Sequence, residues 1–342
     1  MDFQEALEFD KSTYDVVTLG ELVVDFISGE YLEETRDRGM KDLQVFSRYF
    51  GGSPGCLAVN LKALGFHPGI ISALGRDFLG DYLLDFLVQK GVSLEGISRT
   101  QEANTSVVFV SKSRNNPSFL ALRGSDKHLR VTKAQEEVVD GGKILHFTSW
   151  SLSHEPSRSS TLALIKRAKD RGMRISMDPN FREVLWDNKE EGRRIIKEMF
   201  SKVDFVKPSL EDARNLFPED AHKSLSPREY LHKFLSLGAK MVILTLGAEG
   251  LIAGNGKEER KLPGGKNPVV DTTGAGDAFW AGLYAALLKG YSLERALKHG
   301  SQVADYKLGY VGGIPPLPRF QKFMEKEEKE DANRLYESPG EF

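Results

Sequence analysis

The run Asp271-Thr272-Thr273-Gly274-Ala275-Gly276-Asp277-Ala278-Phe279 leads directly into an apolar stretch, Ala278 to Leu288. Such a stretch predicts a buried helix that begins at the glycines. The backbone N–H groups of Gly274, Ala275 and Gly276 would lie in its first turn, where they have no partner within the helix. The two glycines also let an anion approach the backbone closely. The run therefore predicts a binding site for a phosphate group.

Asp277 closes this run and lies next to the predicted anion site. A phosphate would repel its carboxylate, so we expect the side chain to face an incoming hydroxyl group. The helix N-terminus favours the ionised carboxylate, which leaves it a weak base. A weak base is sufficient for phosphoryl transfer, because the nucleophile's proton leaves late and positioning dominates catalysis. For a lone Gly-x-Gly a simple helix cap is the better interpretation, but the full nine-residue run favours catalysis.

The composition is that of an ordinary globular protein. With 342 residues and 40% hydrophobic content, the chain can bury a substantial core. Its 47 Lys and Arg against 49 Asp and Glu leave no excess positive charge for nucleic acid. One cysteine, Cys56, excludes an intrachain disulfide and a Cys-cluster zinc site, and favours a cytoplasmic location. The apolar stretch after Asp277 is shorter than the about 20 residues that cross a bilayer, so we expect no membrane partner.

The chain divides into three parts. Residues 1–14 lack the features of a signal peptide and predict a flexible N-terminal arm. Residues 15–322 alternate short β-rich runs with amphipathic helices, which predicts an α/β domain whose mainly parallel central sheet has helices on both faces. Residues 323–342 predict a charged C-terminal tail.

Two segments, about 21–50 and 104–124, are β-rich without a helix-length spacer, and the second holds a turn at 114–117. Their spacing alone indicates a small antiparallel sheet that projects from the main domain.

The run at Asp271 to Phe279 resembles the signature of the ribokinase-like carbohydrate kinases, the phosphofructokinase-B type family, and further local matches extend from Gly20 to about Gly313. The resemblance implies a ribokinase-like α/β fold in which the small β-sheet is a lid over the sugar. It also implies ATP and Mg²⁺ as cofactors. Asp277 would be the catalytic base, and the backbone from Gly274 to Gly276 would neutralise the transferring phosphoryl group.

Substrate-binding residues are implied by two motifs. Asp25, in Gly20 to Phe26, is similar to the family's aspartate that binds sugar hydroxyls, for which a carboxylate is well suited. Gly51 and Gly52 are similar to the family's di-glycine motif, whose backbone approaches the substrate. This chain has Cys56 where many relatives have a sugar-binding Asn, and Asn60, one helical turn later, is an alternative donor.

Two arginines are further candidates for the substrate site. Arg182 follows a predicted strand, and Arg123 ends a predicted lid strand. Arg182 could bind a phosphate or a substrate carboxylate through two hydrogen bonds, or form an internal ion pair instead. Arg123 is the second candidate for the cation that an acid substrate would need. The runs Asp178 to Trp186 and Glu155 to Ser159 resemble the fructokinase and 2-keto-3-deoxygluconate kinase branch of the family.

The nucleotide site is implied by weaker matches. Lys207 to Asp212 resembles the family's Asn-x-x-Glu motif, so Asp212 would bind Mg²⁺ through water, with Glu211 as the rival carboxylate. A plain helix cap by Ser209 is compatible with this role. The candidate nucleotide-binding residues are Lys207, Ser209, Thr245, Gly247, Gly250 and Ser301. Asp271, Thr273 and the Gly312-Gly313 turn match regions that bind a monovalent cation such as K⁺ in some relatives.

The sequence thus predicts an ATP-dependent sugar kinase that acts on a primary hydroxyl, with fructose as the first choice of substrate. The alternative within the class is a 2-keto-3-deoxygluconate kinase, and a nucleoside kinase is more remote. A non-catalytic sugar-binding regulator with the same fold is the alternative outside enzymes. An exposed lid edge invites pairing, which predicts a homodimer through the lid.

Overall fold

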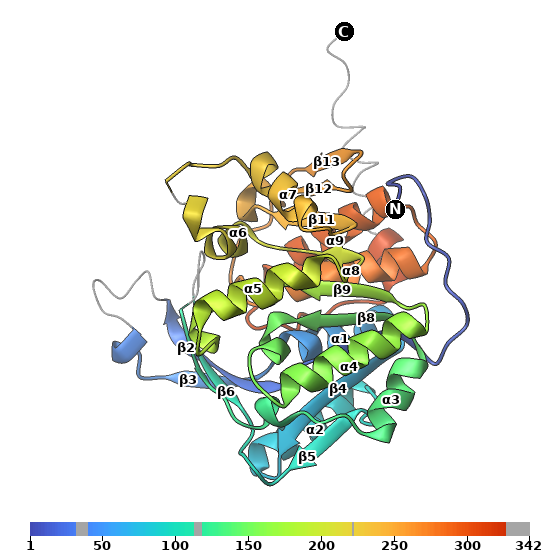
Figure 1. The fold of residues 1–342 in the computed structure, drawn as a ribbon. Coiled ribbons are helices and arrows are strands. Elements are labelled where there is room, and N and C mark those ends of the chain that lie inside the picture. The colour runs from blue at the N-terminus through green and yellow to red at the C-terminus, as the bar shows by residue number, and fades with distance from the viewer. Residues whose placement is uncertain (32–39, 113–117, 221, 326–342) are drawn as a thin grey trace.

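The computed structural model describes residues 1–31, 40–112, 118–220 and 222–325 (Figure 1). Within these ranges, nine strands form the main sheet in the order β13-β12-β11-β10-β9-β8-β1-β4-β5. The strands are β1 (Tyr14–Leu19), β4 (Pro68–Gly75), β5 (Ile97–Thr100), β8 (Gly142–Thr148), β9 (Arg174–Asp178), β10 (Phe205–Val206), β11 (Met241–Thr245), β12 (Leu251–Gly254) and β13 (Glu259–Leu262).

Every neighbouring pair from β5 to β11 is parallel, and only β12 and β13 at one edge are antiparallel. The predicted mainly parallel sheet is confirmed. The order of the strands reverses at β1, which pairs with β4 on one side and β8 on the other. In open α/β sheets, ligands bind at the carboxyl ends of the strands beside such a reversal point.

Helices cover both faces of the main sheet, as predicted (Figure 1). They are α1 (Ser53–Leu64), α2 (Phe78–Lys90), α3 (Lys133–Asp140), α4 (Ser157–Asp170), α5 (Lys189–Phe200), α6 (Leu210–Leu216), α7 (Pro227–Ser236), α8 (Ala275–Leu288) and α9 (Leu293–Lys307). Alternate residues of a strand face opposite layers. Val17 of β1 packs in the core with α3, α4 and α5, whereas Val16 packs in the core with α1, α8 and α9.

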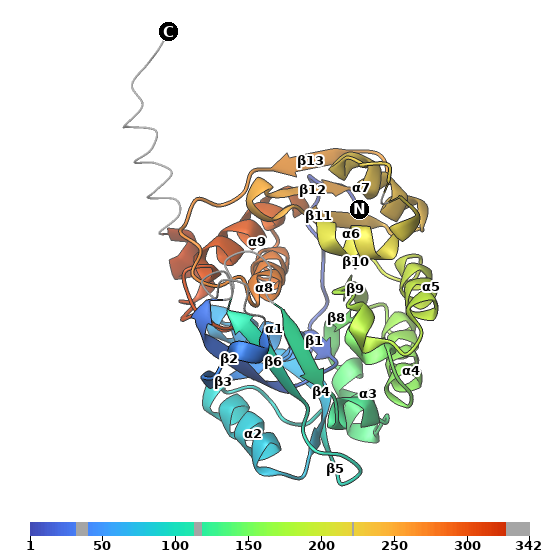
Figure 2. The same cartoon turned by 90° about the vertical axis from the view of Figure 1, so that its left-hand side faces the viewer.

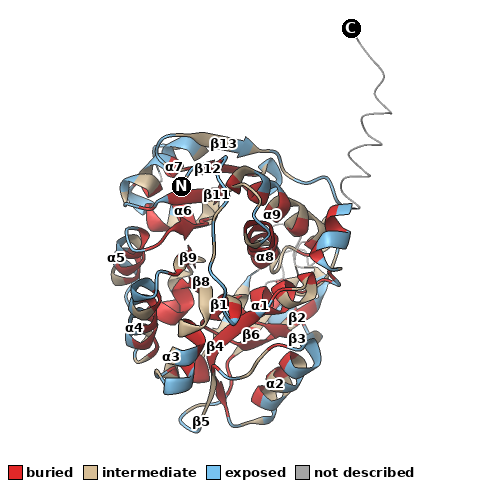
Figure 3. Ribbon diagram, turned by 90° about the vertical axis from the view of Figure 1, so that its right-hand side faces the viewer, coloured by how far each residue is buried: buried red, intermediate tan, exposed pale blue. Residues whose placement is uncertain are grey.

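Helix α8 lies in the helical layer that it forms with α1 and α9 on one face of the main sheet. Figure 3 colours most of α8 as buried. All residues from Asp277 to Leu287 are buried, because α8 packs against α1 on one side and α9 on another. The predicted buried helix is confirmed. It begins at Ala275, and Gly274 precedes it in the left-handed conformation with φ 76°, which glycine adopts without steric cost.

A second sheet forms the lid, with the strand order β3-β2-β6-β7, and it faces the viewer in Figure 2. Its strands are β2 (Val23–Tyr31), β3 (Phe46–Gly51), β6 (Val107–Lys112) and β7 (Phe119–Leu122). The pairs β2–β3 and β6–β7 are antiparallel, but the central pair β2–β6 is parallel.

The prediction of a small antiparallel sheet is therefore wrong for its central pair, β2–β6, which is parallel. Strand β2 follows the carboxyl end of β1, and β6 follows the carboxyl end of β5. Since β1 and β5 point the same way in the main sheet, both strands enter the lid from the same side. The predicted turn at 114–117 lies outside the described residues.

The N-terminal segment, expected to be a flexible arm, docks on the main domain at Phe3. The Phe3 side chain is fully buried, and its carbonyl accepts a hydrogen bond of 2.9 Å from the Glu294 amide. At the other end, residues 320–325 are helical, with Phe323 and Met324 buried. The remainder of the predicted tail lies outside the described residues. Among the residues that the structure describes, no helix has the length and apolarity needed to cross a membrane.

Candidate active site

The carboxyl ends of five parallel strands bring polar side chains to one edge of the main sheet. Glu21 follows β1, Thr148 ends β8, Asp178 ends β9, Lys207 follows β10, and Thr245 ends β11. All but Thr245 are buried. This edge lies beside the reversal of strand order, where the topology predicts a ligand site.

The turn before α8 presents backbone donors at this edge. The Ala275 amide donates to the Thr272 carbonyl at 3.2 Å. Within the described parts of the chain, the amides of Gly274, Gly276 and Asp277 have no protein partner. Of the three amides that the sequence predicts for an anion, Gly274 and Gly276 are thus unpaired, whereas the Ala275 N–H already donates to Thr272. Unpaired amides at a helix start suit an anionic oxygen.

A buried cation lies beside these amides. The Lys207 ammonium is 2.7 Å from the Asp178 carboxylate, and both side chains are at most 10% exposed. Trp280 of α8 also donates to Asp178, through its ring nitrogen at 3.0 Å. A Cβ added to Gly276 would stand 3.1 Å from the Lys207 nitrogen, so only a glycine leaves this space open between the helix start and the lysine.

Asp277 is buried in the first turn of α8, and its carboxylate accepts a hydrogen bond from the Ser53 hydroxyl. Burial raises the pKa of Asp277 to about 7, and the charge of Asp178 adds to this, whereas the Ser53 hydrogen bond, Lys207 and Lys307 lower it. The expectation that the helix N-terminus keeps Asp277 a weak, ionised base is therefore wrong. Desolvation of the charged form outweighs the helix dipole.

Asp25 of β2 lies at the same site from the lid side. Burial raises its pKa to about 7, with the charges of Asp277 and Asp271 as further causes. Asp25 is buried, with only 9% of its surface exposed. Its side chain nevertheless has no hydrogen-bond partner within the described ranges. A Cβ added to Gly51 would overlap the Asp25 carboxylate. The first glycine of the di-glycine motif thus makes room for the aspartate.

Glu21 and Ser53 are site residues that the sequence alone did not reveal. The Glu21 carboxylate accepts hydrogen bonds from the Ser53 amide at 3.3 Å and the Thr148 hydroxyl at 3.1 Å. Gly52, at φ 94°, brings its backbone so close to the Glu21 carbonyl that a Cβ would overlap it. The position of Ser53 beside two glycines was the available signal, since such a backbone turn allows close approach.

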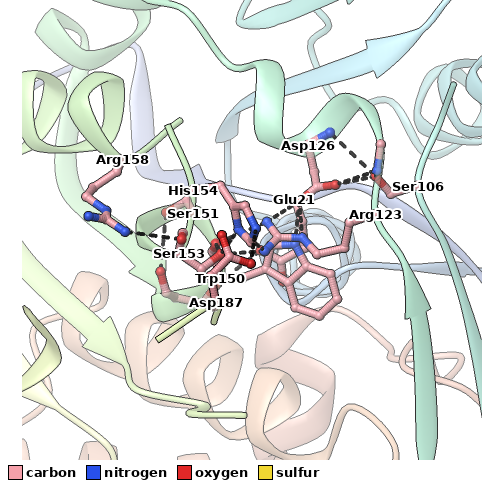
Figure 4. A network of polar contacts seen from close by, with 12 residues as sticks. Glu21, Ser106, Arg123, Asp126, Trp150, Ser151, Ser153, His154, Arg158 and Asp187 are labelled. Atoms are coloured by element: carbon pink, nitrogen blue, oxygen red, sulfur yellow. Dashed lines mark hydrogen bonds and ion pairs between the residues drawn. The ribbon is translucent and has the colours of Figure 1, made fainter. Parts of the chain in front are cut away.

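Arg123 lies in a polar cluster with Asp126 and Trp150, and Figure 4 shows Glu21 in the same network. Its guanidinium donates to Asp126 from two nitrogens, with 2.8 Å for the Nε bond, and also to Ser153. The Trp150 ring nitrogen donates to the same Asp126 oxygen at 2.7 Å. The donors of Arg123 are thus engaged within the protein, so a substrate would have to compete with Asp126 for this arginine.

Arg182 is also paired within the protein, because its guanidinium donates to the Glu211 carboxylate. Their side chains are 30% and 39% exposed. The charge of Glu211 offsets that of Arg182 at the surface of the site. A substrate carboxylate would have to compete with Glu211 for this arginine.

Ser209 and Asp212 form a capping box at the start of α6. The Asp212 carboxylate accepts from the Ser209 amide at 2.8 Å, from its hydroxyl at 2.6 Å, and from the Phe181 amide at 2.6 Å. Burial raises the pKa of Asp212. The predicted helix cap by Ser209 is confirmed. Within the described residues, no group of three or more His, Cys, Asp or Glu side chains could bind a metal ion.

The other nucleotide candidates lie further along the same edge. Thr245 pairs with Ser209 in an isolated bridge. Gly247 and Gly250 form the turn between β11 and β12, and a Cβ on Gly250 would overlap the backbone of residues 262–264. Ser301 lies on α9 and donates to the Leu297 carbonyl at 3.1 Å. The structure thus brings Ser209, Thr245 and the turn together, whereas the one contact it gives Ser301 lies within α9.

Unpaired amides beside a buried lysine suit a transferring phosphoryl group, and an aspartate with a near-neutral pKa suits the proton of an attacking hydroxyl. Together these groups fit a phosphoryl transfer from a nucleotide to a hydroxyl. The chain belongs to the pfkB family of carbohydrate kinases, whose model matches residues 13–319. The predicted family and the ribokinase-like fold are confirmed.

Three relatives illustrate the likeness. An ATP-dependent 6-phosphofructokinase of Thermoanaerobacterium thermosaccharolyticum is 40% identical over 93% of this chain and 95% of its own length. The solved fructokinase of Halothermothrix orenii is 39% identical with a TM-score of 0.73, over 84% of this chain and 97% of its own. A double mutant of the Vibrio cholerae fructokinase, in its fructose-, ADP- and potassium-bound form, is 25% identical with a TM-score of 0.77, over 92% and 99%.

Proposed function

We propose that this sugar kinase is an ATP-dependent fructokinase in which Asp277 accepts the proton of a primary hydroxyl of the sugar. The observation that carries the proposal is the position of Asp277, buried at the helix start that holds the unpaired amides of Gly274 and Gly276. Its pKa of about 7 matches a base that works near neutral pH.

The nucleotide phosphates bind at Gly274, Gly276 and Lys207 in this proposal, while Ala275 holds the turn through its hydrogen bond to Thr272. The amides donate to the oxygens of the γ-phosphate, and the Lys207 ammonium offsets their charge. Thr245, Gly247, Gly250 and Ser301 border the nucleoside, with Ser209 next to Thr245. Ser209, Thr245 and the turn at Gly247 to Gly250 are supported by their common location at the carboxyl edge of the sheet. Ser301 lies on α9 and rests on the family resemblance alone.

Mg²⁺ fits this site as an ion bound chiefly by the phosphates and water, because it keeps several of its waters. It would neutralise the charge that develops on the phosphates. Asp212 is the candidate for ordering one of those waters. Three of the about four lone-pair positions of its carboxylate are taken by Ser209 and Phe181, which leaves room for one water.

Asp25, Gly51 and Gly52 bind the sugar in this proposal. The Asp25 carboxylate has no protein partner within the described residues, so it can accept hydrogen bonds from two neighbouring hydroxyls. The lid strand β2 carries Asp25 across from Asp277, whose charge raises the Asp25 pKa. The sugar would therefore lie between the two carboxyl groups.

A second candidate function is phosphorylation of fructose 6-phosphate. It is favoured by the 40% identity to an ATP-dependent 6-phosphofructokinase. A 2-keto-3-deoxygluconate kinase needs a cation for the substrate carboxylate, and both arginines proposed for it, Arg123 and Arg182, are paired within the protein. That alternative is accordingly less favoured.

The test is ADP formation with MgATP and six acceptors: fructose, fructose 6-phosphate, 2-keto-3-deoxygluconate, ribose, tagatose and adenosine. We expect turnover on fructose and a loss of about 10³-fold in kcat for Asp277→Asn, since general base catalysis contributes about 10² to 10⁴-fold. The matched control is Asp187→Asn, whose side chain is 94% exposed and which should keep its activity.

Each other outcome points to one alternative. Turnover on fructose 6-phosphate alone would favour the second candidate, and turnover on the keto-acid alone would return Arg123 and Arg182 to the substrate site. Binding of a sugar without ADP formation would favour a non-catalytic regulator.

For the cell, we propose a cytoplasmic location, supported by the single, buried Cys56.

A further inference from the structure

Lys307, the last residue of α9, has a fully buried side chain next to the active-site loop. Its ammonium donates to the backbone carbonyls of Asp271 at 2.6 Å and Tyr310 at 3.1 Å. It also lies 4.0 Å from the Asp271 carboxylate, which is fully buried too. A lysine is almost never fully buried unless it is paired, so this position requires an explanation.

The Asp271 carboxylate joins the same two loops as Lys307 does. One oxygen accepts from the Thr273 amide at 3.0 Å and its hydroxyl at 2.8 Å, and the other accepts from the Gly312 amide at 2.8 Å. Lys307 adds the carbonyls of Asp271 and Tyr310 to this link. The loop that leads to α8 and the turn at Gly312 are thus held together by one carboxylate and one ammonium.

This link fixes the turn that carries the unpaired amides. Gly274 packs so tightly against Gly313 that a Cβ on Gly274 would overlap the Gly313 Cα. The Gly313 carbonyl in turn accepts from Asn60 of α1 at 3.1 Å. A shift of the Gly312-Gly313 turn would therefore move Gly274 and the donors beside it. Asn60, a candidate sugar donor from the sequence, is engaged in holding this turn.

A monovalent cation is the group that the family implies at this place, and the Vibrio cholerae fructokinase is a potassium-bound relative. Backbone carbonyl oxygens are the ligands that K⁺ uses in proteins. In this chain the Asp271 and Tyr310 carbonyls already accept hydrogen bonds from Lys307. A free cation would also be repelled by the fixed ammonium charge. The residues present do not fit an additional cation.

We propose that the Lys307 ammonium is a built-in monovalent cation that positions the Gly274 to Asp277 turn, so that catalysis does not require K⁺. The proposal rests on the kinase function proposed above. Burial lowers the pKa of Lys307 to about 8, while the charge of Asp271 raises it, so the side chain is charged at pH 7. Its charge also lowers the pKa of Asp277. Lys307 is a positioning residue, since it touches neither proposed substrate.

The first test compares kcat in KCl, NaCl and tetramethylammonium chloride at equal ionic strength. We expect the wild-type protein to change less than about twofold among the three salts. Lys307→Ala removes the ammonium and leaves the carbonyls and the Asp271 carboxylate around a cavity. A misplaced donor set costs about 10²-fold, so we expect kcat to fall by that factor in tetramethylammonium and to recover at least tenfold in KCl or NH₄Cl.

The second test measures binding without activity, through the melting temperature in the same salts. Lys307→Ala should be stabilised by KCl relative to tetramethylammonium chloride, whereas the wild type and the exposed control Lys322→Ala should not. Selective activation or stabilisation of the wild type by K⁺ would overturn the proposal, even if Lys307→Ala does not fold. A folded Lys307→Ala that K⁺ neither rescues nor stabilises would also overturn it. Absence of sugar phosphorylation in every salt would contradict only the proposed kinase function. The melting temperatures would still show whether Lys307 replaces a bound cation.

Discussion

At the scale of single residues, the site is governed by two buried carboxyl groups on opposite sides of the proposed sugar position. The pKa of each is about 7, because burial disfavours the charged form, and the charge of Asp277 further raises the pKa of Asp25. A free enzyme at neutral pH therefore holds these groups near the midpoint of their titration. Activity should decline as the pH falls below about 7, since Asp277 must be ionised to accept a proton.

Ser53 tunes this pH dependence, because its hydrogen bond lowers the pKa of Asp277. Ser53→Ala should raise that pKa and move the acidic limb of the kcat/KM profile to higher pH. A hydrogen bond worth about 1 kcal/mol corresponds to about 0.7 pH unit. The control is Ser236→Ala, an exposed serine that bonds only to a nearby carbonyl. An acidic limb unchanged by Ser53→Ala would show that Asp277 is not the group that titrates.

Asp25→Asn should stabilise the free protein while it weakens sugar binding. The folded-state pKa of Asp25, about 7, lies above its ordinary value of 3.8. Its stabilising contribution is thus complete below about pH 4 and is lost as the pH rises through 7. An Asn does not ionise, so the protein keeps this stability at high pH. Each unit by which the Asp25 pKa is raised corresponds to about 1.4 kcal/mol of stability.

We therefore expect the gain in the free energy of unfolding to be at least about 1 kcal/mol larger at pH 8 than at pH 4. Urea unfolding at the two pH values, without ligands, measures it. A gain that is the same at both would mean that the Asp25 carboxyl is not perturbed by burial.

At the scale of elements, the cluster around Arg123 joins the lid to the main domain. Arg123 follows β7, whereas its partners Asp126 and Trp150 belong to the main domain (Figure 4). The side chains of Arg123 and Asp126 are 7% and 0% exposed, so Arg123→Met leaves a buried carboxylate without its counter-ion, held only by neutral donors such as Trp150. Breaking such a pair costs about 3 to 5 kcal/mol.

We expect Arg123→Met to lose about 3 kcal/mol in urea unfolding, and Asp126→Asn in the same chain to restore part of it. The KM for the sugar should change little. A stable Arg123→Met variant with a much higher KM would instead place Arg123 in the substrate site, as the sequence first suggested.

Local patterns were sufficient to predict most elements, because period and capping are encoded nearby. Helix α8 begins among the glycines and ends at Leu288, as the apolar stretch predicts. Asp77 likewise caps α2 from nearby in the sequence, accepting from the Leu79 and Gly80 amides. The parallel pair β2–β6 was not predictable from spacing, since its direction follows from where the strands leave the main sheet. Ser53 and Asp277 are 224 residues apart, and only tertiary packing brings them together.

At the scale of the whole molecule, the site is closed by two bodies that meet at the Gly51-Gly52 turn. In the proposed site, the main domain supplies the phosphate side, through Lys207 and the start of α8, and the lid supplies Asp25. Separation of the two bodies would break the approach of Asp25 to Asp277 without altering either core. A surface that holds the lid in place from outside would therefore favour the closed, catalytic arrangement.

The outer face of the lid has the character of such a surface. Leu120 and Leu122 of β7 are each 53% exposed. Phe26 and Phe109 stack beside them with ring centroids 5.3 Å apart, and Phe46 meets Phe109 edge-on at 5.4 Å. The register pairs Phe109 with Leu120 and with Phe26, so these side chains share one face. The two leucines are exposed and the three phenylalanines beside them are half-buried, so this face offers apolar surface to a partner.

We predict that this face packs on the lid of a second copy and forms a homodimer. Sedimentation velocity should give twice the mass of the 342-residue chain. Leu120→Lys with Leu122→Lys should produce a monomer, because two charges cannot be buried in an apolar interface. The control is Val184→Lys, which alters a residue that is 76% exposed but lies outside the lid. If lid contacts hold Asp25 in place, the monomer should show a raised KM for sugar with less change in the KM for ATP. A wild-type chain that sediments as a monomer at micromolar concentration would contradict the prediction.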